Sequence, residues 1–158
     1  MEAFLASVRR MSGGPFVDPP IPFTHTLLVG PGIYLTPSFV KNNEIENIIN
    51  VADEVACPRW ARLSFGKRYK HIPMDDSEKE SLNRVYAQFA DALDSSKGRT
   101  YVHCQAGMNR SVSMSIAYIL RKYNVQIEDV VGFAARHRPC ILTNPHFNKQ
   151  LLEISKKK

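Results

Sequence analysis

The sequence predicts one α/β domain in which a central mixed, largely parallel sheet is flanked by helices. Short runs rich in β-branched residues alternate along the chain with segments in which apolar residues recur every three or four positions. The length of 158 residues is that of one ordinary domain. Hydrophobic residues make up 44% of the chain, which is enough to supply a single buried core. We expect an N-terminal helix and an extended arm to precede this domain.

The first residues are expected to form a short helix followed by a linker. Phe4, Leu5, Val8 and Met11 lie on one side of such a helix, which either packs on its own domain or docks on a second copy. The chain from residue 12 is then too rich in glycine and proline for regular structure. We therefore assign residues 1–22 to an N-terminal helix with a Gly/Pro-rich linker, and residues 23–158 to the globular domain.

Four strands and a short helix are expected in the first half of the domain. The strands are short apolar runs, at residues 27–29, 33–35, 48–52 and 69–73. A turn at residues 30–32 would join the first two strands into a β-hairpin, and Pro37 suits the first turn of a helix that ends near Asn42. Residues 57–67 have no clear period and are expected to form a basic surface loop.

The second half of the domain is predicted to be mostly helical. Residues 82–93 have the apolar spacing of an amphipathic helix, and residues 100–102 form a short strand that leads to Cys104. Helical spacing returns beyond Arg110 and continues in two further segments, residues 127–137 and 145–156. This order of elements sets Cys104 and Arg110 between a strand and a helix.

The loop between that strand and that helix is predicted to bind a phosphoryl group. It has five residues, Gln105-Ala106-Gly107-Met108-Asn109, between Cys104 and Arg110. Backbone N–H groups of a tight loop converge on one point, and the helix N-terminus adds the positive end of its dipole. Gly107 permits the backbone conformation and the close approach that such a loop requires.

The residues at the two ends of this loop suit nucleophilic chemistry. A cysteine at the focus of the loop is favoured as the thiolate, which is the nucleophilic form. The planar fork of Arg110 can bind two phosphoryl oxygens and follow them into the transition state. Ser111 can donate a hydrogen bond to the sulfur as it leaves a phosphoenzyme. The sequence thus predicts Cys104 as a nucleophile, with Arg110 and Ser111 as its partners.

The segment His103-Cys104-Gln105-Ala106-Gly107-Met108-Asn109-Arg110-Ser111 resembles the signature of the protein tyrosine phosphatases, HCxxGxxR followed by Ser or Thr. The short chain is similar to the dual-specificity branch, and the resemblance covers residues 25–154. It implies a protein tyrosine phosphatase-like fold and hydrolysis of phosphotyrosine and phosphoserine or phosphothreonine in proteins through a cysteinyl phosphate. The implied mechanism requires no metal and no other cofactor.

The general acid and two supporting residues also follow from the resemblance. Family members carry the acid four residues after the position of Ile72, which selects Asp76 over its neighbour Asp75. His103 would fix the backbone of the cysteine through a hydrogen bond. Asn144 would either bond to the phosphate loop from the side or cap the last helix.

Asn109 adds a closer resemblance, because most cellular members carry Ser or Gly before the arginine. The sequence is similar there to poxvirus virion phosphatases, and also at His71-Ile72-Pro73 and at residues 144–147. In that viral group the N-terminal helix mediates dimerisation. The resemblance therefore implies a viral protein of the host cytoplasm or virion that forms a homodimer through residues 4–11.

Charge and loop composition leave alternative functions open. The net charge of +6 would attract anionic partners such as phosphoproteins, nucleic acid or lipid head groups. RNA 5′-triphosphatases of the superfamily also carry Asn before the arginine, but Gln105-Ala106 replaces their Thr-His pair. A phosphoinositide phosphatase would need lysines within the loop. A pseudophosphatase that only binds phosphoproteins would not need the thiolate.

Cysteine usage and hydropathy favour a place inside the cell. The three cysteines, Cys57, Cys104 and Cys140, have no metal-ligand spacing and do not suit a disulfide framework, although Cys57 or Cys140 could pair with an oxidised Cys104. No run approaches the roughly 18 apolar residues that span a membrane. We expect a protein of the cytoplasm without a membrane partner.

Overall fold

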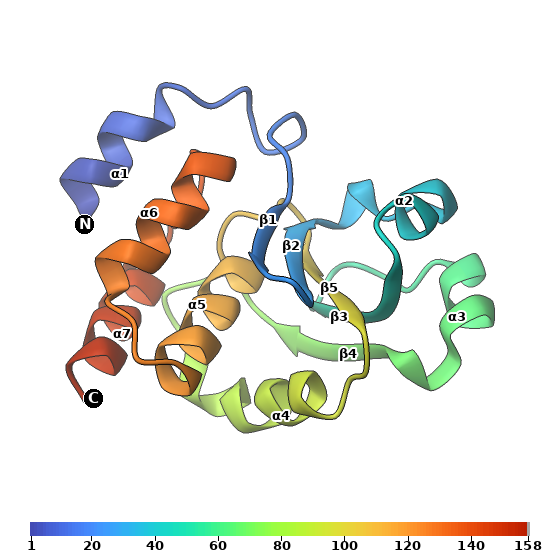
Figure 1. Ribbon diagram of the computed structural model, residues 1–158. Coiled ribbons are helices and arrows are strands. Elements are labelled where there is room, and N and C mark those ends of the chain that lie inside the picture. The colour runs from blue at the N-terminus through green and yellow to red at the C-terminus, as the bar shows by residue number, and fades with distance from the viewer. Residues whose placement is uncertain (158) are drawn as a thin grey trace.

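The computed structural model describes residues 1–157. Five strands form one sheet in the order β1-β2-β5-β3-β4. Their bounds are β1 Ile21–Thr24, β2 Leu27–Pro31, β3 Ile45–Ala52, β4 Tyr69–Met74 and β5 Arg99–Cys104. β1 is antiparallel to β2 and the other pairs are parallel, which confirms the predicted mixed, largely parallel sheet (Figure 1).

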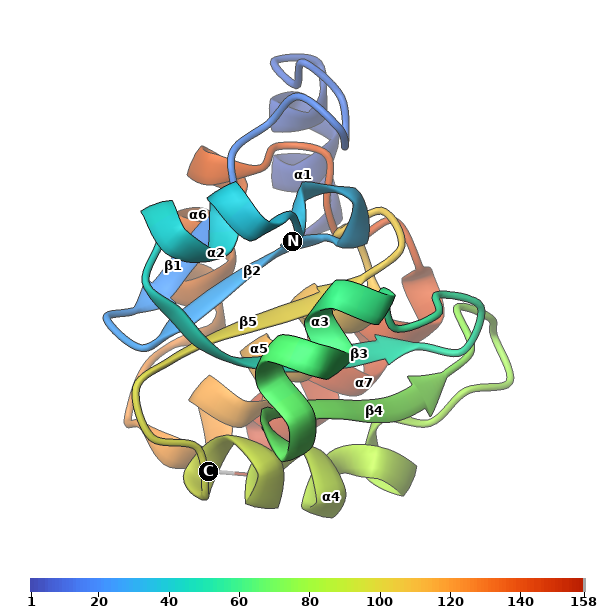
Figure 2. The same cartoon turned by 90° about the vertical axis from the view of Figure 1, so that its right-hand side faces the viewer.

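Helices cover both faces of the sheet (Figures 1 and 2). They are α1 Glu2–Arg9, α2 Pro37–Asn42, α3 Arg59–Phe65, α4 Leu82–Asp94, α5 Arg110–Lys122, α6 Ile127–His137 and α7 Pro145–Lys156. α2 and α3 lie on one face, and α4 to α7 on the other. Successive side chains of β5 point to opposite faces of the sheet and so belong to different parts of the core. Tyr101 packs in the α2–α3 layer, while Val102 and Cys104 face the α5 side.

Two local predictions are wrong. Residues 32–34 form a 3₁₀ turn instead of a strand, and the hairpin joins β1 and β2 around Thr24–Leu27. β2 already has β1 on one side and β5 on the other, so no free edge is left for residues 33–35. The expected surface loop at residues 57–67 contains α3, because Ala61 and Phe65 lie one turn apart and pack against the sheet.

The N-terminal helix packs on its own domain. Leu5 is fully buried in the core, and the Arg9 guanidinium donates to the carbonyl groups of Ile141 (3.2 Å) and Leu142 (2.6 Å). Glu2 accepts a hydrogen bond of 2.8 Å from the Asn148 amide. The segment before β1 is thus fixed to the body of the molecule, while the division at residue 22 remains a prediction.

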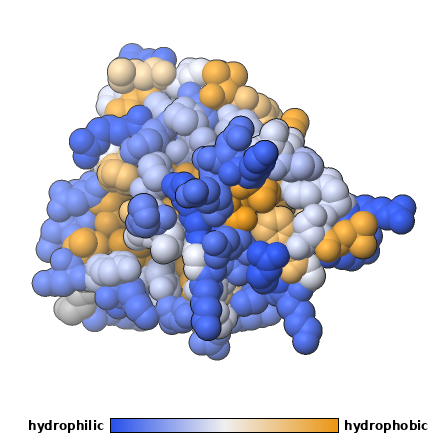
Figure 3. Space-filling model, turned by 45° about the vertical axis from the view of Figure 1, so that its right-hand side comes forward, coloured by the Kyte–Doolittle hydropathy of each residue, from blue (hydrophilic) through white to orange (hydrophobic). Residues whose placement is uncertain are grey.

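Polar side chains cover much of one face of the molecule (Figure 3). Figure 3 shows one face, on which hydrophilic side chains predominate and apolar groups are scattered. Within residues 1–157, no helix is both long enough and apolar enough to cross a membrane.

Candidate active site

Cys104 ends the central strand of the sheet, at the edge where the parallel strands carry their carboxyl ends. Its side chain is buried, with 2% exposed, and its Sγ lies 3.2 Å from the hydroxyl oxygen of Ser111 in the first turn of α5. The structure therefore brings the expected nucleophile and Ser111 together. Ligands of open parallel sheets bind outside this edge.

The loop after Cys104 is held from outside by its carbonyl groups. The Gly32 N–H donates to Gln105 O (3.1 Å), and the Leu142 N–H donates to Met108 O (2.9 Å). Arg138 donates to the carbonyl groups between them. In a trans peptide the next N–H points away from the carbonyl, so the N–H groups of the loop are turned toward its inner side. That arrangement is the cradle for a phosphoryl group that the sequence predicts.

Gly107 is required at its position in the loop. Its φ of +64° is in the left-handed region, and a Cβ there would lie 2.5 Å from the carbonyl carbon of Gly30 and from the nitrogen of Pro31. The loop is thus pressed against the end of β2, where no side chain fits.

Arg110 begins α5 and is held by two acidic residues that the sequence analysis missed. Its guanidinium donates to both carboxylate oxygens of Glu54 (2.6 and 2.5 Å), to Asp53 (3.2 Å) and to the carbonyl oxygen of Met74 (3.0 Å). Nε of Arg110 is buried and has no partner among the described residues. This donor remains available for a phosphoryl oxygen. Two consecutive acidic residues directly after β3, at the carboxyl edge of the sheet, were the signal in the sequence.

The ion pair shifts the pKa of each partner. Hydrogen bonds from Arg110 lower the pKa of Glu54 to about 2. Burial opposes the charge of Arg110, but the hydrogen bond to Glu54 prevails and raises its pKa. The hydrogen bond with Glu54 raises the pKa of Asp53, the more exposed carboxyl. Glu54, which accepts from two nitrogens of the guanidinium, is therefore the acidic residue that orients Arg110 most strongly.

Asp76 contacts the phosphate loop, whereas Asp75 does not share these contacts. The Asp76 carboxylate accepts hydrogen bonds from the side-chain amides of Asn109 (3.0 Å) and Asn144 (2.9 Å). The backbone N–H of Asp75 donates to Glu80. Asn144 also caps α7, because its Oδ1 accepts from the N–H groups of His146 and Phe147. Of the two roles that the sequence left open for Asn144, its side chain therefore takes the capping role, and its contact with the phosphate loop is made by its backbone N–H, which donates to Asn109 Oδ1 (3.3 Å).

His103 is buried beneath the loop with 1% of its surface exposed. Its Nδ1 lies 3.1 Å from the carbonyl oxygen of Cys104, as a residue that fixes the cysteine backbone would. Burial lowers the pKa of His103 to about 4, so the imidazole is neutral near pH 7. Its Nε2 has no partner among residues 1–157.

Comparison with known proteins identifies the family. The family described as dual specificity phosphatase, catalytic domain, matches residues 29–157. This chain belongs to the dual specificity phosphatase family. The predicted family and its α/β fold are confirmed, and the narrower poxvirus resemblance remains a prediction.

Relatives of this phosphatase domain are found in animals. Dual specificity protein phosphatase 1-B of Xenopus laevis is 35% identical over 113 residues, which cover 70% of this chain and 30% of that protein. Dual specificity protein phosphatase 1 of Homo sapiens is 34% identical over the same length and with the same coverage. The match thus spans less than a third of the length of these relatives.

Solved structures share the fold of this phosphatase domain. Human DUSP28 has a TM-score of 0.75 at 20% identity, over 88% of this chain and 94% of that chain. The human tyrosine phosphatase-like serine/threonine/tyrosine-interacting protein has a TM-score of 0.73 at 24% identity, over 89% of this chain and 97% of that chain.

A buried arginine supports the phosphatase loop. Arg138 is fully buried and donates to the carbonyl groups of Gly107 (3.1 Å) and Ala106 (2.9 Å), and to those of Asp18 (2.6 Å) and Pro15 (2.8 Å) in the N-terminal arm. One guanidinium thus joins the arm to the loop. The sequence assigns no role to this residue, because its partners lie up to 123 positions away.

The other two cysteines form no disulfide with Cys104. Cys57 and Cys140 are half-buried, and all three cysteines of the chain are free thiols. Within residues 1–157, no group of three or more His, Cys, Asp or Glu side chains is placed to hold a metal ion.

Proposed function

We propose that this chain hydrolyses phosphotyrosine and phosphoserine or phosphothreonine in proteins through a cysteinyl-phosphate intermediate. The observation that carries the proposal is the buried Cys104 thiol at a loop in which the carbonyl groups of residues 105–108 are all engaged from outside, which turns the N–H groups that follow them inward. A dianionic phosphoryl group matches such a site in charge and in the number of donors it accepts.

In the first step, the Cys104 thiolate attacks phosphorus and the P–O bond to the substrate breaks. Asp76 gives its proton to the departing oxygen, while the loop N–H groups and Arg110 stabilise the equatorial oxygens. The unpartnered Nε of Arg110 suits that role. The products of this step are a free hydroxyl group on the protein substrate and a phosphocysteine.

In the second step, Asp76 removes a proton from water, which attacks the phosphocysteine. The S–P bond breaks, inorganic phosphate forms, and the sulfur leaves as a thiolate. Ser111, 3.2 Å from the sulfur, supports this step because its hydroxyl can donate to the developing negative charge.

Two rival functions give different outcomes in the same assays. An RNA 5′-triphosphatase was suggested by Asn109, yet this side chain bonds to Asp76 and Thr143. A protein that binds phosphoproteins without hydrolysing them is the second rival, since the shared fold alone does not separate binding from catalysis. The unpartnered Nε of Arg110 favours a phosphoryl ligand for the proposed function and for both rivals, so substrate turnover must distinguish them.

The test is turnover of a phosphotyrosine peptide, a phosphothreonine peptide and triphosphate-ended RNA by the same preparation. We expect release of phosphate from the peptides and none from the RNA. Cys104→Ser should abolish turnover, and Cys140→Ser, a matched change at a half-buried free thiol, should leave it intact. Peptide turnover by Cys104→Ser would refute the proposal, and peptide binding without turnover by the unmodified protein would support the binding rival.

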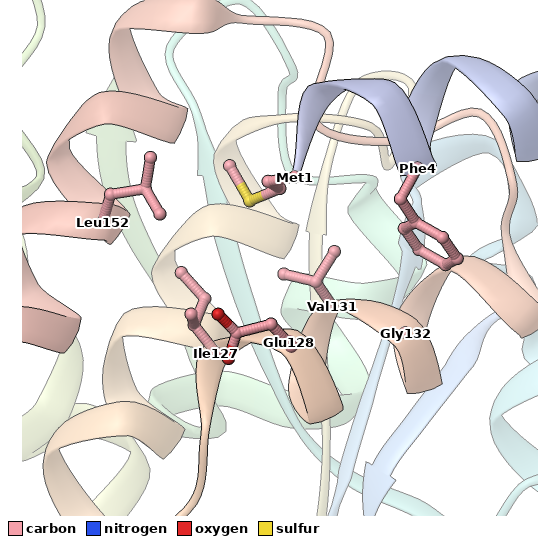
Figure 4. Close-up of a pocket in the computed structure, with 7 residues that line it drawn as sticks. All are labelled: Met1, Phe4, Ile127, Glu128, Val131, Gly132 and Leu152. Carbon is pink, nitrogen blue, oxygen red and sulfur yellow. The ribbon is translucent and has the colours of Figure 1, made fainter.

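We also propose that the chain forms a homodimer through α1, in the cytoplasm or a virion. Met1, the N-cap of α1, and Phe4 of α1 line an apolar cavity of about 250 Å³ together with Ile127 and Val131 of α6 (Figure 4). Phe4 is 43% exposed at its rim. An apolar rim beside an open cavity supports contact with a second copy.

Light scattering tests this dimer. The unmodified protein should have twice the mass of one chain, and Phe4→Asp should reduce it to one chain. Ile33→Asp, an equally polar change at an apolar residue that is 69% exposed elsewhere, is the control. A single-chain mass for the unmodified protein at all concentrations would contradict the proposal.

A further inference from the structure

We propose that Asn109 is a positioning residue for the general acid: its amide holds the Asp76 carboxylate against the phosphate loop and does not bind the phosphoryl group. The inference rests on the proposed function, because it assumes that Asp76 donates the proton. It gives a task to the least typical residue of the loop.

Two amides hold the two oxygens of Asp76. Nδ2 of Asn109 donates to Oδ2 (3.0 Å), and Nδ2 of Asn144 donates to Oδ1 (2.9 Å). Asp76 lies on an exposed segment between β4 and α4, where a carboxylate without partners would sample several rotamers. With one donor on each oxygen, the rotation of the carboxyl group is restricted in both χ angles.

The orientation of the Asn109 amide is determined by its backbone partners. Oδ1 of Asn109 accepts from the N–H groups of Thr143 (2.7 Å) and Asn144 (3.3 Å). A backbone N–H can only donate, so the oxygen of the amide must face residues 143 and 144. The NH₂ group must then face Asp76, because a reversed amide would set its NH₂ group against two backbone donors and its oxygen against the Asp76 carboxylate.

The N-terminus of α5 shows what Asn109 does not do. Asn109 occupies the N-cap position, where an asparagine side chain usually accepts from the first-turn N–H groups. Here it makes no such bond. The first-turn N–H groups, which need an acceptor, therefore remain available to a phosphoryl oxygen, and the amide is free to hold the acid.

Serine or aspartate in place of Asn109 could not make the same set of hydrogen bonds. Serine has one short hydroxyl, which cannot reach Asp76 and also accept from residues 143 and 144. Aspartate has the same shape but would set a second carboxylate against Asp76, which is unfavourable for two like charges in contact. Asparagine is the residue that offers an acceptor on one side and donors on the other.

The test separates proton donation from phosphate binding by the leaving group. The leaving group of phenyl phosphate is phenoxide, a strong base that needs a proton as it departs. The leaving group of 4-nitrophenyl phosphate is 4-nitrophenoxide, a weak base that departs readily without one. Asn109→Ser should lower kcat/KM, which reports formation of the phosphocysteine alone, about 10-fold more for phenyl phosphate than for 4-nitrophenyl phosphate, since positioning errors weaken acid catalysis, which contributes about 10²–10⁴-fold. Asp76→Asn should show the same selectivity with a larger loss, and Asn83→Ser on α4 is the matched control.

Three outcomes are informative. If Asp76→Asn has no leaving-group selectivity, the proposed function loses its acid and the inference loses its basis. If Asp76→Asn is selective and Asn109→Ser slows both substrates equally, or slows neither, Asn109 is not a positioning residue. In the Asp76→Asn background, Asn109→Ser should add no selectivity.

Asn109→Asp guards against a loss of folding. It retains the shape of asparagine and the acceptor for residues 143 and 144, so the loop should survive and inorganic phosphate should still inhibit. It should nevertheless reproduce the selective loss on phenyl phosphate, and unselective kinetics from this variant would overturn the inference.

Discussion

The buried imidazole of His103 should make the stability of the protein depend on pH. The pKa of His103 falls from an ordinary value of 6.5 to about 4 because burial disfavours its charged form. Below pH 6.5 the unfolded chain therefore binds a proton that the folded chain does not. The stabilisation is fully present above pH 6.5 and is lost as the pH falls toward about 4.

The size of the effect follows from the shift. A difference of about 2.5 pKa units corresponds to roughly 3 kcal/mol, and about 2 kcal/mol of it should appear between about pH 8 and about pH 5. His103→Asn removes the titrating ring and keeps a donor near the Cys104 carbonyl group. Its free energy of unfolding should therefore change less over this range than that of the unmodified protein.

Urea denaturation followed by circular dichroism, repeated across this pH range, measures the difference. Taking the unmodified protein minus His103→Asn cancels the titration of every other group. His25→Asn, at an exposed histidine, serves as the control and should keep the pH dependence of the unmodified protein. Parallel curves for the unmodified protein and His103→Asn, within about 0.5 kcal/mol, would refute the reasoning.

Three other perturbations have expected outcomes. Gly107→Ala should abolish turnover, since its Cβ would lie 2.5 Å from the Gly30 carbonyl carbon, and vanadate titration should show no binding. Glu54→Gln should weaken vanadate binding about 10-fold by loosening Arg110; because the pKa of Glu54 is about 2, its ion pair should persist above pH 4.5 and be lost only as the pH falls toward 2. Leu5→Ala should cost about 2–5 kcal/mol in urea denaturation, and the control Phe4→Ala, at a 43% exposed side chain, much less.

The sequence was sufficient to predict the features that depend on residues close together in the chain. The phosphate loop is one continuous segment, so its residue types reveal both the cradle and its nucleophile. Helices α4 to α7 were recognised because their apolar residues recur over three turns or more. α3 was missed because it has only two turns, with Ala61 and Phe65 the buried pair among basic residues.

Contacts between distant segments were beyond the sequence. Glu54 and Arg110 are 56 positions apart, and Asn109 and Asp76 are 33 apart. No spacing rule joins them, since they meet only because parallel strands carry their following loops to one edge of the sheet. The resemblance to a family supplied Asp76, but not the amides that hold it.

The contacts of Arg138 show that the structural unit begins upstream of the region that matches the family. The recurring family unit begins at residue 29, yet Arg138 bonds to Pro15 and Asp18, which lie upstream of that boundary. A shortened protein that started at residue 29 would keep every residue of the signature and lose half of the acceptors around a buried positive charge. Its guanidinium would then bind water or leave the loop carbonyl groups. The phosphate loop would lose rigidity although all its signature residues were still present. Chimaeras of this domain should therefore be joined upstream of Pro15.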